Sequence, residues 1–185
     1  MKVGVLALQG DFREHALVLS DIDMTPVEVR TADQLAEVDA LVIPGGESTT
    51  IGKLARQHDL VDPIRERARH GMPVFGTCAG MIVMAREVEG GEPLLSLMDI
   101  EVRRNAYGRQ IDSFEADVDV QGIGEPVRAV FIRAPWVEAI GPGVKVLAEH
   151  EGRPVVLEQG NLVVASFHPE LARDPRLHEY VLGKR

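Results

Sequence analysis

The sequence predicts an α/β fold of three layers, with a mostly parallel central sheet, helices on both faces, and antiparallel strands added in the second half. Up to about residue 88, short apolar runs alternate with amphipathic stretches, as in a parallel sheet that is covered on both faces. From about Met98 onward, apolar runs follow one another across tight turns, which is typical of hairpins and therefore of antiparallel strands.

In the first half, the apolar runs predict strands and the amphipathic stretches predict helices. The predicted strands are residues 2–8, 26–30, 39–46 and 72–77. The predicted helices are residues 11–20, 48–58, 62–70 and 79–88. Helix starts are indicated by Asp11 and Glu14, which have the spacing of a capping box, by the hydroxyl side chains of "STT", and by Asp62 ahead of Pro63.

In the second half, the turns in "EHEGRPV" and "EQGNLVV" predict two hairpins. The run "NLVVASFHPE" predicts an apolar strand that ends in polar residues, and residues 174–183 predict a terminal helix. No repeat, low-complexity tract or linker interrupts the 185 residues, so we expect one domain over residues 1–185.

Composition and charge argue against several classes of function. Hydrophobic residues make up 45% of the chain and aromatic residues 4%, which indicates a compact domain with an aliphatic core. The net charge of −9 argues against nucleic-acid binding, which needs a basic surface. No apolar run approaches the roughly 18 residues of a membrane span. The single cysteine, Cys78, cannot form an internal disulfide, so we expect a reducing, cytoplasmic location.

Unusual residues follow three of the predicted strands. The segments are Gly45–Gly46–Glu47, Gly76–Thr77–Cys78 and His168–Pro169–Glu170. In open α/β sheets, sites form outside the carboxyl ends of the strands, so we expect these three segments to meet.

Cys78 lies in "GTCAG", which has the form of a nucleophile elbow with a thiol in place of a hydroxyl. Small neighbours allow the sharp turn from strand to helix, and the amino end of the following helix favours the thiolate. The alternative is a small, inert buried side chain, which is common for a free cysteine.

In "FHPE", the proline disfavours a helical conformation at His168, so His168 and Glu170 lie on the same face of an extended segment. An imidazole held by a carboxylate can take the proton of Cys78. The alternative is a surface turn after the last strand. The remaining histidines are predicted to be solvated surface residues: His15, His58, His70, His150 and His178.

The glycines of "PGGEST" allow backbone N–H groups to approach an oxyanion that develops during acyl transfer. A phosphate loop does not fit, because Gly46 and Gly52 are one residue too far apart and Leu54 replaces the required hydroxyl residue. A plain turn with a helix cap remains an alternative. No Cys/His cluster has the spacing of metal ligands, so no metal is predicted.

In this order along an α/β chain, the motifs resemble the class I (triad) glutamine amidotransferases. Within that family, the chain is most similar to the glutaminase subunits of pyridoxal 5'-phosphate synthase. The blocks that carry the narrower resemblance are "GVLALQGDFREH", "LVIPGGESTTIGKL", "FGTCAGMI", "RNAYGRQIDSFEAD", "FIRAP" and "SFHPEL". They run from Gly4 to Leu171 and cover nearly the whole chain.

The resemblance implies hydrolysis of L-glutamine to L-glutamate and ammonia through a glutamyl thioester. Cys78 would be the nucleophile, His168 the general base and acid, and Glu170 the carboxylate that orients the imidazole. Backbone N–H groups near Gly46 and at Ala79 would hold the oxyanion. The residues implied in glutamine binding are Gly46, Glu47, Ser48, Arg104, Ile132 and Arg133.

The resemblance also implies a partner, a (β/α)8-barrel synthase subunit that builds pyridoxal 5'-phosphate from the ammonia, and no cofactor in this subunit. Arg103, in place of an acidic residue, and Trp136, after "IRAP", depart from the pattern.

Three alternatives stay open: a glutaminase of another synthase, a non-catalytic binding module, and a cysteine peptidase or chaperone of the related superfamily. The presence of Cys78, His168 and Glu170 argues against a non-catalytic binding module. The peptidases and chaperones usually have a histidine directly after the cysteine, and Ala79 at that position argues against them. Gln9 ends an apolar strand, which indicates a contact with the site or with a partner.

Overall fold

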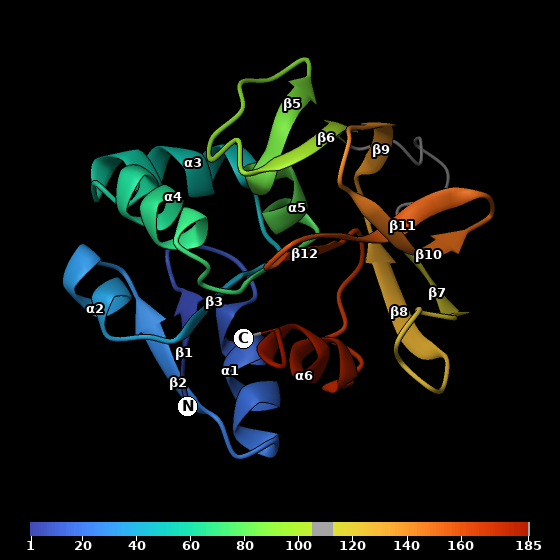
Figure 1. Cartoon of the computed structure of the whole chain (residues 1–185), viewed down its shortest axis with the longest axis horizontal. Helices are drawn as coiled ribbons and strands as arrows, with labels where there is room; N and C mark the ends of the chain where they lie inside the picture. The colour runs from blue at the N-terminus through green and yellow to red at the C-terminus, as the bar shows by residue number, and fades with distance from the viewer. Residues whose placement is uncertain (105–112, 185) are drawn as a thin grey trace.

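A seven-stranded central sheet organises the chain in the computed structural model, which describes residues 1–104 and 113–184 (Figure 1). The strand order is β10-β11-β12-β4-β3-β1-β2. Neighbouring strands from β12 to β2 pair in parallel, whereas β10–β11 and β11–β12 pair antiparallel. The strands are β1 (Lys2–Leu6), β2 (Thr25–Val29), β3 (Ala40–Ile43), β4 (Val74–Thr77), β10 (Lys145–His150), β11 (Arg153–Gln159) and β12 (Leu162–Ala165).

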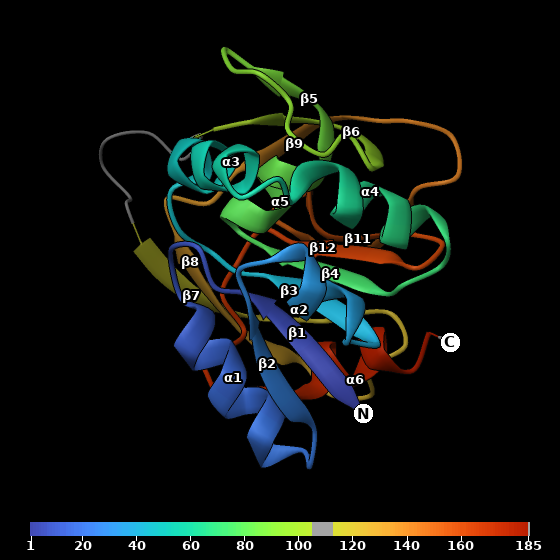
Figure 2. The ribbon, with the colours of Figure 1, turned by 90° about the vertical axis from the view of Figure 1, so that its left-hand side faces the viewer.

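Helices cover both faces of this sheet. Figure 2 shows α3, α4 and α5 on one side of the central strands and α1 and α6 on the other. Along β3, Leu41 and Ile43 pack into the core of the first side, and Ala40 and Val42 pack into the core of the second, because strand side chains alternate. The helices are α1 (Phe12–Asp21), α2 (Ala32–Ala36), α3 (Ser48–Gln57), α4 (Val61–Arg69), α5 (Ala79–Met84) and α6 (Arg176–Leu182). This confirms the predicted α/β class.

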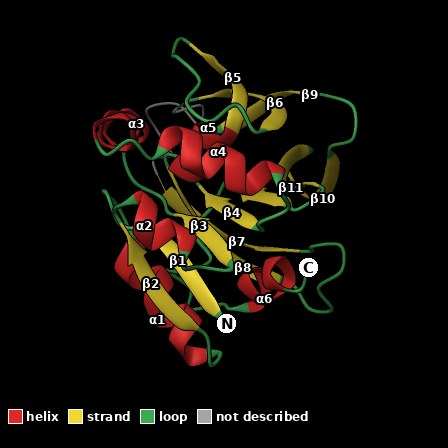
Figure 3. Cartoon of the chain, turned by 60° about the vertical axis from the view of Figure 1, so that its left-hand side comes forward, coloured by secondary structure: helices red, strands yellow, loops and turns green. Residues whose placement is uncertain are grey.

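The second half differs in part from the prediction, because only some of its antiparallel strands join the central sheet. Two separate sheets hold the others (Figure 3). One contains β5 (Ala85–Glu89), β6 (Met98–Arg103) and β9 (Trp136–Ile140), and the other pairs β7 (Ser113–Val118) with β8 (Val127–Ile132). The former packs on the side of α5, and the latter packs on the side of α6.

The predicted helix over residues 79–88 is therefore wrong in its second half. Helix α5 ends at Met84, and Ala85 takes up an extended conformation with φ −61° and ψ 147°. From there the chain pairs with β6, with Val88 opposite Val102. β-branched valines suit such pairing, so contacts distant in sequence outweigh the helical pattern.

Three of the predicted helix starts also differ in detail. The side chain of Asp11 makes no cap of α1. Its backbone N–H, which a capping box would pair with the side chain of Glu14, donates instead to the carbonyl of Gly45 at 3.0 Å. Glu47, rather than a hydroxyl residue, caps α3. Helix α4 begins at Val61, so Pro63 is its third residue, where no helical N–H is required.

Four adjacent strands direct their carboxyl ends to one edge of the sheet: β1, β3, β4 and β12. The segments that follow them hold Gln9, Gly46, Cys78 and His168. Among the described residues, no helix has the length and apolar character to cross a membrane.

Candidate active site

The nucleophile elbow is present where the sequence predicts it. Cys78 lies between β4 and α5 with φ 49° and ψ −103°, a left-handed conformation that side chains rarely adopt. The neighbouring Gly80 has no alternative, because a Cβ there would lie 2.2 Å from the carbonyl oxygen of Ile43. The Cys78 side chain is almost buried, and its Sγ lies 3.7 Å from the carbonyl oxygen of Ile132. The thiol is therefore held at one place at the end of β4.

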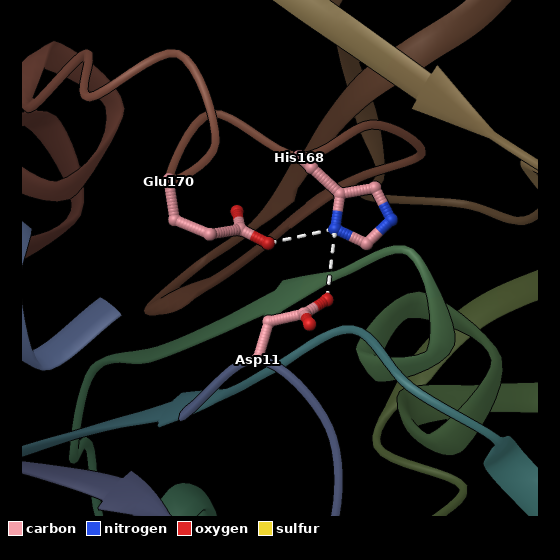
Figure 4. Close-up of side chains that lie close together, drawn as sticks. All are labelled: Asp11, His168 and Glu170. Atoms are coloured by element: carbon pink, nitrogen blue, oxygen red, sulfur yellow. Dashed lines mark hydrogen bonds and ion pairs between the residues drawn. The ribbon is translucent and has the colours of Figure 1, made fainter. Parts of the chain in front are cut away.

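His168 and Glu170 follow β12 and form a buried pair (Figure 4). Nδ1 of His168 lies 2.7 Å from Oε1 of Glu170, so the ring donates from Nδ1 and presents Nε2 on its other side. The backbone N–H of His168 donates to the carbonyl of Val130 at 2.8 Å, which anchors the segment to β8. A second carboxylate, Asp11 Oδ2, lies 3.4 Å from the same Nδ1.

Burial and mutual electrostatic interactions shift the pKa values of His168, Glu170 and Asp11. Burial alone would lower the pKa of His168, but the interactions with Cys78 and Glu170 raise it to about 10. Burial raises the pKa of Glu170, and the hydrogen bond to His168 opposes that effect. Burial likewise raises the pKa of Asp11, against the attraction of His168. An imidazolium beside Cys78 is therefore stabilised at neutral pH, which is the charge state that accompanies a thiolate.

The glycine-rich segment after β3 allows the imidazole to approach. A Cβ on Gly45 would lie 2.3 Å from Cε1 of His168, so only glycine fits there. Oε1 of Gln9 accepts a hydrogen bond from the backbone N–H of Glu47 at 2.7 Å. Gln9 therefore contacts the predicted oxyanion segment directly.

The carboxylate of Glu47 contacts the start of α3 and the side chain of Arg104. It accepts hydrogen bonds from the backbone N–H groups of Thr49 and Thr50, and the side-chain hydrogen bond of Thr49 is the largest reason why the pKa of Glu47 falls to about 2. Arg104 Nη2 lies 3.2 Å from Oε1 of Glu47. An anionic carboxylate and a guanidinium are thus placed side by side, where the two charged groups of an amino acid could be recognised.

A cavity of about 620 Å³ lies over these groups. Every predicted site residue except the buried Glu170 lines it. The cavity also contacts Gln9, Asp11, Ile82, Ser113 and Leu171, most of which the motifs did not indicate. Residues 105–112, which carry most of the "RNAYGRQIDSFEAD" block, lie outside the described residues.

A metal ion does not suit the carboxylate and imidazole atoms at this site. Ligand atoms of Asp11, His168 and Glu170 lie within 4.8 Å of one another. However, Nδ1 of His168 donates to Glu170, and a ligating nitrogen must be bare.

Two histidines that the sequence analysis assigned to the surface are buried, and that prediction was wrong. His15, on α1, is 0% exposed, and His178, on α6, is 1% exposed. His15 Nδ1 lies 2.8 Å from His178 Nε2, and His15 Nε2 lies 3.0 Å from Oγ1 of Thr77. Helical periodicity identifies which residues share a face, but not which face packs against a histidine of another helix.

Comparison with known proteins agrees with this geometry. Residues 5–184 match the SNO glutamine amidotransferase family. The chain belongs to this glutamine amidotransferase family. A pyridoxal 5'-phosphate synthase subunit PdxT of Frankia alni is 58% identical to it over 96% of this chain and 91% of the relative. A PdxT of Pelotomaculum thermopropionicum is 56% identical over 100% and 95%.

A solved structure described as a glutamine amidotransferase superposes on this glutamine amidotransferase chain with a TM-score of 0.94. Its sequence is 49% identical, and the match covers 98% of this chain and 97% of the other. The predicted family and fold class are thereby confirmed.

Proposed function

We propose that the chain hydrolyses L-glutamine to L-glutamate and ammonia and is the glutaminase subunit of a pyridoxal 5'-phosphate synthase. The observation that carries the proposal is the hydrogen-bonded His168–Glu170 pair. Its imidazole interacts with Cys78, and both His168 and Cys78 line the cavity. The name and near-complete coverage of the PdxT relatives support the synthase assignment. The proposal takes residues 1–185 as one glutaminase domain.

In the first half-reaction, Sγ of Cys78 attacks the side-chain amide carbon of glutamine. His168 gives its proton to the amide nitrogen, the carbon–nitrogen bond breaks, and ammonia leaves behind a glutamyl thioester. In the second half-reaction, His168 takes a proton from water, the hydroxide oxygen bonds to the thioester carbon, and the carbon–sulfur bond breaks. Glutamate is released and the thiolate–imidazolium pair returns.

The tetrahedral intermediate of each half-reaction carries a negative oxygen. In the proposed mechanism, the backbone N–H of Ala79 and one near Gly46 hold this oxyanion. Glutamine would bind in the cavity against Glu47, Ser48 and Arg104. The backbone of Ile132 and Arg133 would complete its contacts on the β8 side.

The ammonia would pass to a (β/α)8-barrel synthase subunit in a hetero-oligomer within the cytoplasm. The hydrogen bond of Gln9 supports a control of turnover by this partner. It fixes the N–H of the Gly46–Glu47 peptide toward Gln9, and a trans peptide then directs the carbonyl of Gly46 the opposite way. Docking next to Gln9 would turn the peptide and supply an oxyanion donor.

Glutamate and ammonia release from L-glutamine tests the proposal, first with the pure chain and then with a barrel synthase subunit and its pentose and triose phosphates. We expect glutamate release that rises with the synthase, and we expect the nitrogen of the released ammonia to be incorporated into pyridoxal 5'-phosphate. If glutamate release were absent under both conditions, the proposed reaction would be wrong. If it occurred but never supported pyridoxal 5'-phosphate formation, only the assigned partner would be wrong.

A further inference from the structure

Behind the triad, a chain of buried polar groups leads away from the cavity. Oε2 of Glu170, the oxygen that His168 does not use, makes no hydrogen bond among the described residues and lies 3.4 Å from Nε2 of His15. The same Nε2 lies 3.0 Å from Oγ1 of Thr77, the residue before Cys78. On the other side of the ring, Nδ1 of His15 lies 2.8 Å from Nε2 of His178. One imidazole therefore connects the carboxylate, the strand of the nucleophile, and the terminal helix.

We propose that His15 is a positioning residue for the triad, whose Nε2–H attracts the second oxygen of Glu170, and that His178 fixes the tautomer that this requires. The inference rests on the proposed roles of Cys78, His168 and Glu170. His15 is fully buried and does not line the cavity, so it acts through Glu170 rather than on the substrate.

Both histidines are neutral in this environment. Burial is the largest reason why the pKa of His15 lies well below its ordinary value, and His178 and His168 lower it further. Burial also lowers the pKa of His178 to about 4, against an opposing interaction with the backbone of Asp174. Each neutral ring carries one N–H and one bare nitrogen, so the pair can be arranged in two ways.

The charge of Glu170 selects between the two arrangements. The titratable groups that face this carboxylate are His168 on Oε1, His15 on Oε2, and Asp11 nearby. An ionised Glu170, the counter-ion of the His168 imidazolium, can only accept hydrogen bonds. A bare Nε2 of His15 would place a lone pair against it, whereas Nε2–H attracts it.

A proton on Nε2 of His15 also determines the protonation of the other buried groups. With its proton on Nε2, His15 has a bare Nδ1, which accepts from Nε2–H of His178. Nδ1 of His178 is then bare, and among the described residues it makes no hydrogen bond. The opposite arrangement would direct Nδ1–H of His178 toward the Asp174 backbone. It would leave Nε2 of His15 bare, to accept from the hydroxyl of Thr77 and to face the carboxylate of Glu170 with a lone pair.

The packing holds both rings in place. The ring of Phe75 on β4 meets each imidazole edge-on, with centroids 6.5 Å from His15 and 5.2 Å from His178. Thr77 lies two residues further along the same strand and is itself 0% exposed. The distance between His15 and Glu170 is therefore set by α1, β4 and α6 together.

The decisive variants are His15→Leu, which removes both ring nitrogens, and His15→Gln, whose amide can return an N–H toward Glu170. We expect His15→Leu to lower kcat about tenfold at pH 7 with KM within about twofold of the wild type. Without the donor, Glu170 protonates more readily, so the acidic limb of the kcat profile should move to higher pH. His15→Gln should restore most of both changes.

A matched control separates positioning from loss of packing. Val18→Ala removes a buried apolar group from the same helix, so it should lower the melting temperature without moving the pH profile. Alkylation of Cys78, the only thiol in the chain, gives a readout without substrate. It should be several-fold slower near neutral pH in His15→Leu and unchanged in Val18→Ala.

Nitrogen NMR of the imidazoles in the wild-type chain reads the tautomers directly. A proton on Nε2 of both His15 and His178 is expected, and a bare Nε2 on His15 would overturn the inference. So would unshifted pH and alkylation profiles in a folded His15→Leu, or in His15→Gln a loss as large as that of His15→Leu. Failure of the proposed function is distinguishable, because then wild type and Cys78→Ala would release glutamate equally.

Discussion

The side chain of Gln9 accepts a hydrogen bond from the backbone N–H of Glu47 across 2.7 Å, between the segment after β1 and the segment after β3. In the proposed mechanism, this bond restrains the peptide that would otherwise present its N–H to an oxyanion. Gln9→Ala should therefore raise glutamine turnover of the isolated chain several-fold, because a missing oxyanion donor costs roughly a hundredfold. Gln9→Glu, which keeps an acceptor, is the control. Equal or lower turnover in Gln9→Ala would contradict a restraining role.

The same restraint predicts activation by the synthase partner. Titration of the wild-type chain with the barrel subunit should raise glutamate release to a plateau, and the relative rise should be smaller for Gln9→Ala. The measurement is steady-state glutamate release at saturating L-glutamine. Full activity of the isolated chain, with no rise on saturation, would rule this mode of control out.

The triad predicts a hierarchy of losses. Cys78→Ala should abolish glutamate release and leave synthesis from added ammonium intact, because ammonia bypasses the thioester. His168→Asn should be nearly as damaging, and Glu170→Gln milder, since the carboxylate orients and stabilises but does not transfer the proton. The double variant of His168 and Glu170 should lose little more than His168→Asn alone. Losses in kcat that simply multiplied would mean that the two residues do not act as a unit.

The close approach of Gly45 to the imidazole gives a test by addition rather than deletion. Gly45→Ala places a methyl group 2.3 Å from the present position of Cε1 of His168, much closer than a normal contact. The ring must move, and a displacement of about 1 Å can cost roughly a hundredfold in turnover. Circular dichroism should show an intact fold. Gly124→Ala, at an exposed position with no atom within 4 Å of the added Cβ and no left-handed backbone, is a control for the substitution itself.

The buried histidines predict how stability depends on pH. His178 has its pKa lowered, mainly by burial, to about 4, so the unfolded chain binds this proton more readily than the folded chain. Stability from this group is present above pH 6.5 and is lost as the pH falls toward 4, on the order of 3 kcal/mol in total. The free energy of unfolding, measured with urea, should therefore fall less steeply with decreasing pH in His178→Leu than in the wild type. His58→Leu, at an exposed histidine, should keep the wild-type slope.

The elbow at Cys78 and the His168–Glu170 pair could be predicted from the sequence, because both depend on residue type and short spacing. The elbow needs small residues around Cys78, and the proline after His168 extends the segment that carries Glu170. Both patterns are present in the structure, because each depends on residues that are close together in the sequence. The alternation of strands and helices in the first half is local for the same reason, which is why the central sheet could be expected.

Residues whose surroundings depend on distant contacts escaped prediction. Asp11 and Glu14 have the spacing of a capping box, but the carbonyl of Gly45 takes the N–H that the box requires. The amphipathic pattern of α1 does not reveal that His15 meets a histidine 163 positions away. Pairing with β6 likewise converts the end of a helical pattern into β5.

The position of β12 between β11 and β4 has a consequence for the order in which the molecule is made. Gln9, Asp11 and His15 leave the ribosome before His168, Glu170 and His178. A nascent chain that lacks β12 has a gap in the sheet beside the elbow and no imidazole to pair with its thiol. Such long-range closure is slow compared with helix formation. Under the proposed function, glutamine hydrolysis therefore begins only after the segment from β12 to Glu170 has been synthesised, and shorter nascent fragments release no ammonia.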